Sequence, residues 1–66
     1  MEIQDRFEIM QDVMLRIDVI VDELRRLETS EPDPKAKAYI GKIFKNQIHA
    51  KVAAMDYCLY IKPRLS

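Results

Sequence analysis

The stretch Thr29-Ser30-Glu31-Pro32-Asp33-Pro34 decides the fold of this 66-residue chain. Each proline restricts the residue before it to an extended backbone, so a helix that reaches this stretch cannot continue through it. Asp33 has a side chain suited to capping a helix N-terminus, and Pro34 fits the first helical position, where no N–H is needed. The stretch therefore predicts a short turn, at about residues 29–33, between two helices that fold back antiparallel.

The segment before the turn has the apolar periodicity of a helix over about residues 2–28. Apolar residues alternate spacings of four and three, which places them on one helix face: Ile3, Phe7, Met10, Met14, Ile17, Val21 and Leu24. A second series, Val13, Ile20 and Leu27, lies beside the first and widens this face. The stripe is therefore broader than a single partner helix can cover.

The segment after the turn predicts a second helix over about residues 34–61, which ends before Pro63. Its apolar residues occupy one broad arc: Ile40, Ile43, Phe44, Ile48, Met55, Cys58, Leu59 and Ile61. Together the two helices predict an all-α, single-domain hairpin over residues 1–66. We expect a core made of Phe7, Met14, Ile17, Val21, Ile40, Phe44, Ile48 and Leu59.

The size of the chain indicates that it needs a further source of stability. A chain this short buries only about 60% of its unfolded surface. Its one cysteine excludes an internal disulfide, and one cysteine with one histidine cannot build a tetrahedral zinc site. Self-association remains, and the wide apolar stripes favour it. We expect a homo-oligomer, most simply a dimeric four-helix bundle, with trimers and hexamers open and with parallel and antiparallel docking of hairpins not distinguished by the apolar pattern.

Charge divides between the two halves. Residues 1–29 hold eight acids and four bases, a net −4, whereas residues 30–66 hold three acids and seven bases, a net +4. We interpret this as complementarity between the helices, within the hairpin and between protomers. The alternative is a basic side of the second helix, with Lys42, Lys45 and His49, that binds RNA or DNA.

Two polar residues interrupt the apolar arc of the second helix, namely Gln47 and Lys51. We expect Lys51 to lie opposite Gln11, with its stem over apolar surface and its ammonium paired with Glu8 or Asp12. The alternative is a polar layer at an oligomer axis that fixes register or holds an anion.

The C-terminal end combines aromatic and basic side chains, Tyr57, Tyr60 and Arg64, with Lys62 between them. Packing and helix-dipole compensation are the simplest roles. The alternative is that these residues, with Lys51, hold a nucleotide or another anionic ligand between protomers. Cys58 is expected to be a small buried hydrophobe, and a lone thiol suits a reducing compartment, so we expect a cytoplasmic protein.

No catalytic motif, phosphate loop or metal-ligand spacing occurs, so we expect no enzyme activity, no cofactor and no metal site. No apolar run is long enough to span a membrane.

In architecture the chain is similar to small helical-hairpin proteins that dimerise into four-helix bundles, including plasmid RNA-binding regulators, a likeness of shape alone. We expect a homo-oligomeric interaction module that binds or blocks another protein as a regulator, adaptor or inhibitor, a type common in phages and mobile elements. Nucleotide or anion binding and RNA or DNA binding are the alternatives.

Overall fold

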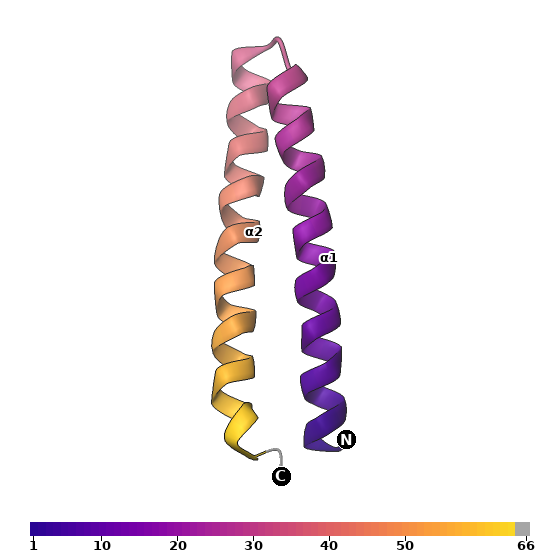
Figure 1. Cartoon of the computed structure of the whole chain (residues 1–66). Coiled ribbons are helices and arrows are strands. Elements are labelled where there is room, and N and C mark those ends of the chain that lie inside the picture. Colours follow the sequence, from indigo (N-terminus) through magenta and orange to yellow (C-terminus); the bar gives the residue numbers. More distant parts are fainter. Residues whose placement is uncertain (65–66) are drawn as a thin grey trace.

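The computed structural model describes residues 1–64 as two long antiparallel helices followed by one short turn of 3-10 helix (Figure 1). Helix α1 spans Ile3–Ser30, α2 spans Pro34–Ile61, and η1 spans Lys62–Arg64. The first residues of α1 and the last residues of α2 lie near each other, opposite the turn (Figure 1). The prediction of an all-α hairpin is confirmed, and residues 1–64 include no strand.

The turn between the helices is shorter than predicted and occupies residues 31–33. Helix α1 continues to Ser30, since Pro32 restricts only Glu31 to an extended backbone, and two hydroxyls near its end bond back to the preceding turn. Thr29 Oγ1 donates to the Arg25 carbonyl at 2.9 Å, and Ser30 Oγ donates to the Arg26 carbonyl at 3.0 Å. Helix α2 begins as the sequence indicates, since the Asp33 carboxylate accepts a 3.0 Å hydrogen bond from the Ala36 N–H.

The core is a narrow seam between the helices. Its buried side chains are Ile17 and Val21 of α1 with Ile40, Ala54 and Ile61 of α2. Of the other residues expected in the core, four are only half-buried: Phe7, Met14, Phe44 and Ile48. The prediction for Leu59 is wrong, because this side chain is 67% exposed. Its neighbour Cys58 faces α1, and Leu59 lies about 100° further around α2, which directs it away from the seam.

The helices meet in a register different from the one that the sequence suggested. Lys51 pairs with Asp18, two turns of α1 away from the expected level of Gln11, and not with Glu8 or Asp12. Two features cause this shift. Helix α1 extends to Ser30, and Cα–Cβ bonds tilt toward the N-terminus of each helix. In an antiparallel pair, both features bring later residues of each helix into contact.

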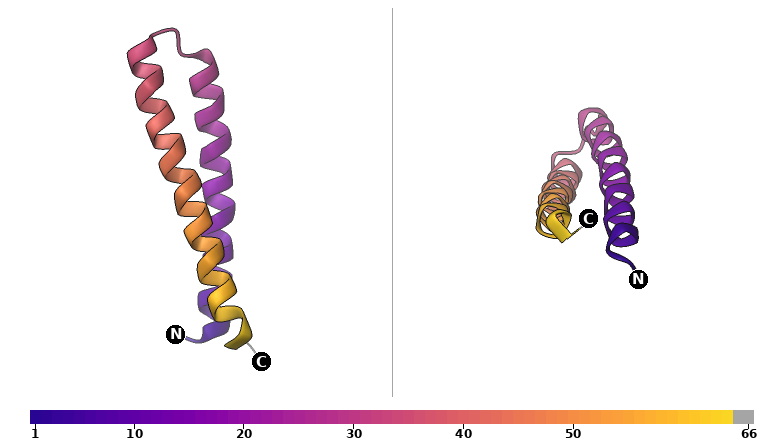
Figure 2. Two further views of the ribbon diagram at one scale, coloured as in Figure 1. Left: turned by 90° about the vertical axis from the view of Figure 1, so that its left-hand side faces the viewer. Right: turned by 60° about the horizontal axis from the view of Figure 1, so that its bottom comes forward.

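The hairpin is elongated and exposes much of its surface. Its extents are 51 × 15 × 15 Å, and its radius of gyration of 15.2 Å exceeds the roughly 11 Å of a compact chain of this length. The two helices pack against each other with their axes inclined, so that they cross in one view (Figure 2). In the described residues, neither helix has the long, nearly uncharged apolar stretch that a bilayer crossing requires.

Candidate functional site

The seam divides the hairpin surface into two faces of different composition. Contacts between the helices lie to one side of the buried residues: Met14 with Cys58, Asp18 with Lys51, and Arg25 with Phe44. Side chains advance around each helix in the same rotational sense along the chain. Because the two helices are antiparallel, side chains just past the buried stripe of α1 and just past that of α2 lie on the same side of the hairpin. These side chains form one face, and the side chains just before the two stripes form the other.

We define the tyrosine face by eight residues: Ile9, Val13, Ile20 and Leu27 of α1, and Tyr39, Ile43, Ala50 and Tyr57 of α2. On each helix the four positions lie within an arc of about 40° at 3.6 residues per turn. No charged residue falls in either arc between these positions. Five of the eight expose 41–56% of their surface, namely Ile9, Ile20, Leu27, Tyr39 and Ile43. The tyrosine face is therefore a continuous apolar surface over both helices.

We define the mixed face by Phe7, Met14, Asp18 and Arg25 of α1 with Phe44, Ile48, Lys51, Met55 and Leu59 of α2. Its charged groups have partners within the chain. Lys51 Nζ lies 2.5 Å from Asp18 Oδ1, and the Arg25 guanidinium lies over the Phe44 ring, 5.5 Å from its centroid. These contacts cover part of the apolar seam with charge, which water can hydrate.

The mixed face contains an apolar hollow near the open end of the hairpin. It has a volume of about 220 Å³, and its lining consists of Phe7, Met14, Met55, Cys58, Leu59 and Lys62. Met55 and Leu59 are exposed, and Phe7, Met14 and Cys58 are half-buried. The Cys58 thiol lies 3.9 Å from the Met14 sulfur. Adaptable thioether side chains around a shallow hollow suit an apolar side chain of a partner, and Lys62 at its edge suits a carboxylate.

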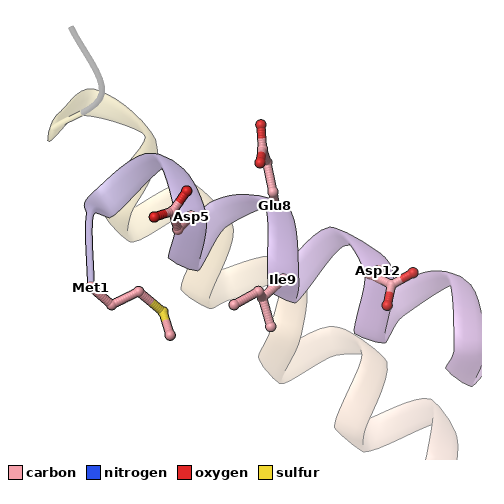
Figure 3. A pocket seen from close by; sticks show the side chains of 5 residues that line it. All are labelled: Met1, Asp5, Glu8, Ile9 and Asp12. Atoms are coloured by element: carbon pink, nitrogen blue, oxygen red, sulfur yellow. The ribbon is translucent and has the colours of Figure 1, made fainter.

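A second hollow lies on α1 alone and is acidic (Figure 3). Its lining consists of Met1, Asp5, Glu8, Ile9 and Asp12. Figure 3 shows Glu8 directed away from Met1 and Ile9, which extend along the other side of the helix. Across residues 1–64, no group of three or more His, Cys, Asp or Glu side chains is arranged to hold a metal ion. This surface is an acidic border beside Ile9.

The structure distributes the predicted ligand-binding residues over separate places. Lys51 and Gln47 are half-buried at the seam, and Lys51 is paired with Asp18. Tyr57 lies half-buried on the tyrosine face. These three residues lie within about three turns of one another along α2, but they do not lie on the same side of the seam.

Tyr60 and Arg64 lie on the outside of the hairpin and contact each other. The Arg64 guanidinium lies over the Tyr60 ring, 4.2 Å from its centroid, and donates a 2.6 Å hydrogen bond to the Tyr60 carbonyl. Tyr60 is about half a turn around α2 from Lys51. Within one chain, Lys51 and the Tyr60–Arg64 pair therefore do not converge on one ligand.

The residues predicted for nucleic-acid binding, Lys42, Lys45 and His49, are all exposed on the outer side of α2. The Lys42 ammonium lies over the Tyr39 ring, 5.6 Å from its centroid. Sequence reasoning missed three partners in these contacts: Asp18, Arg25 and Tyr39. Asp18 and Arg25 follow once the register is known, because both lie within one turn of the level of their partners on α2.

No family model matches the chain, and no curated protein or solved structure is significantly similar to it.

Proposed function

We propose that this chain is a small homo-oligomeric interaction module that binds or blocks another protein, with two hairpins joined in a four-helix bundle. The observation that carries the proposal is the tyrosine face, a continuous apolar surface on a hairpin whose residues 1–64 include only five buried hydrophobic residues. Large exposed apolar patches mark interaction sites in natural proteins.

The exposed area supports self-association. The accessible surface is 5188 Å², whereas a compact monomer of 7.8 kDa exposes about 4,400 Å². The excess of roughly 800 Å² equals the area that one partner contributes to a standard protein–protein interface. One interface of ordinary size would bring the chain to the exposure of a compact protein.

The hollow on the mixed face supports binding of a different protein. If a second hairpin covers the tyrosine face, the hollow at Phe7, Met55 and Leu59 stays accessible, since it lies on the other side of the seam. A dimer then presents two such hollows. The half-buried lone thiol of Cys58 at this site suits a reducing compartment, which supports a cytoplasmic location.

Sedimentation equilibrium and native mass spectrometry at micromolar concentration test the self-association. We expect a dimer or a larger closed oligomer and a melting temperature that rises with protein concentration. A folded monomer with a melting temperature independent of concentration would contradict the proposal.

Capture from lysate with matched variants tests the binding of another protein. Wild type, Leu59→Asp and Val19→Asp are immobilised and the retained proteins are compared. We expect one protein that wild type and Val19→Asp retain and that Leu59→Asp loses, because Val19 is exposed away from the hollow. Identical sets on all three would contradict a partner site at the hollow. Absorbance near 260 nm that copurifies with the protein would favour the nucleotide alternative, and retention that falls steeply with salt would favour nucleic acid.

A further inference from the structure

We propose that two copies of the hairpin pair through their tyrosine faces with both turns at the same end of the bundle. The inference rests on the proposed self-association. It further specifies which face is buried, that a second copy of the chain covers it, and how the two copies are oriented. Three observations carry it, namely the spacing on the tyrosine face, the charges along its borders and the levels at which those charges lie.

The spacing of the tyrosine face is that of a helical seam. On α1, Val13, Ile20 and Leu27 recur every seven residues, and on α2 the seven-residue series is Ile43, Ala50 and Tyr57. A seven-residue apolar repeat keeps one side of a helix against a neighbouring helix over its whole length. Two such repeats on one side of one hairpin match a second hairpin, and a two-fold axis makes that surface complementary to itself.

The outer borders of the tyrosine face carry opposite charge. On α1 the border holds Asp5, Asp12 and Glu23, and its one base, Arg16, already pairs with Asp12 at 3.0 Å. On α2 and the η1 turn that follows it, the border holds Lys35, Lys42 and Arg64 and no acid. A partner that places a basic border beside α1 and an acidic border beside α2 is therefore complementary, and a second copy of the chain supplies both.

The orientation follows from which helices become neighbours. With both turns at one end, α1 lies antiparallel beside the α2 of the second copy. Since Asp18 is level with Lys51, Asp5 is then level with the partner's Arg64, and Glu23 lies within about one turn of the partner's Lys42. With the turns at opposite ends, α1 lies beside the second α1, and the acidic borders of the two copies face each other. Like charges across an interface are unfavourable, so the first orientation is selected.

The test measures distances between nitroxide labels in the full chain by double electron–electron resonance. Cys58→Ala removes the native thiol, and one cysteine is introduced at Thr29, at the turn end of α1, or at Val19, near its middle; both positions are exposed. If the turns lie together, the two Thr29 labels are within about 30 Å of each other. If the turns lie at opposite ends, these labels are separated by about 36 Å along the bundle axis alone, at 1.5 Å per residue. The Val19 labels are close in either orientation.

Each outcome has a separate meaning. Short distances at both positions support the proposed orientation. A short Val19 distance with a Thr29 distance beyond about 40 Å overturns the orientation and leaves the proposed self-association standing. The absence of dipolar coupling at both positions removes the self-association itself. Coupling that survives Ile43→Asp but is lost in Met55→Asp shows that the mixed face is the interface, which overturns the choice of face.

Discussion

The tyrosine face and the mixed face flank the same seam, yet they treat their apolar residues differently. The mixed face covers part of the seam with charges that find partners inside the chain, Lys51 with Asp18 and Arg25 with Phe44. The tyrosine face has apolar side chains at every position of both arcs and leaves six of its eight residues exposed. Paired charged groups on a face can stay in contact with water at little cost. An uncharged apolar face is stabilised only when another surface covers it and removes it from water.

This difference indicates a division of roles between the faces. The tyrosine face is large and regular, which suits a permanent partner with the same repeat. The mixed face is irregular, and its exposed apolar side chains, Met55 and Leu59, line one hollow, which suits a smaller contact with a different protein. Substitutions that affect one face and spare the other test this division.

The largest effect is expected from a charge on the tyrosine face. Ile43→Asp should weaken dimerisation by about 4 kcal/mol, or roughly 1,000-fold, because each copy buries one unpaired carboxylate at a cost of about 2 kcal/mol. The control is Met55→Asp on the mixed face, since Met55 is 44% exposed, Ile43 is 48% exposed, and both lie on α2. Sedimentation equilibrium measures both variants. Equal weakening in the two would show that the faces do not differ.

The next effect concerns the seam that both faces share. Ile17→Ala should lower the free energy of unfolding by about 3 kcal/mol, since Ile17 is 8% exposed and truncation leaves a cavity in a narrow core. Leu15→Ala, at a residue 64% exposed, should change it by less than about 0.5 kcal/mol. Urea unfolding followed by circular dichroism measures both. A similar loss for Leu15 would place it in an interface and widen the contact surface beyond the tyrosine face.

A smaller effect is expected beside the mixed face at Gly41. Gly41→Ala should raise the free energy of unfolding by about 0.5–1 kcal/mol through helix propensity. The added Cβ meets the Glu28 carboxylate at 3.3 Å, and this flexible side chain can move away. Ala53→Gly, at an exposed position of α2, calibrates the opposite change. Destabilisation by Gly41→Ala would show that the mixed face is packed more rigidly than its exposure indicates.

The smallest effect is expected at Lys51. Lys51→Met should change the free energy of unfolding by less than about 0.5 kcal/mol, because the side chains of Lys51 and Asp18 are 35% and 47% exposed and such pairs contribute little. Melting temperature, sedimentation and lysate capture are measured on the same variant. Loss of copurifying absorbance near 260 nm, with unchanged stability and oligomer size, would favour the ligand-binding alternative. A changed oligomer size would place Lys51 in a polar layer of the assembly.

The helices and the turn could be predicted from sequence, because proline, the aspartate cap and apolar periodicity act locally at residues 29–34 and along each helix. The level of contact could not. It depends on where α1 ends, at Ser30 and not near residue 28, and on how the two apolar stripes pack against each other. Consequently the predicted partners of Lys51 were Glu8 or Asp12, whereas its partner in the structure is Asp18. The prediction that Leu59 is buried was wrong for a related reason. A broad apolar arc does not indicate which of its two edges the partner helix covers.

The short turn has a consequence for the order in which the hairpin forms. Glu28 and Gly41 meet across a loop of about a dozen residues, whereas Met14 and Cys58 meet across more than forty. The entropy lost on closing a loop rises with its length, so pairing near the turn comes first and proceeds toward the open end as a zipper does. Substitutions near Glu28 are expected to slow folding, and substitutions near Met14 to speed unfolding. The hollow at Phe7 and Leu59 is therefore the last part of the hairpin to form and the first to open.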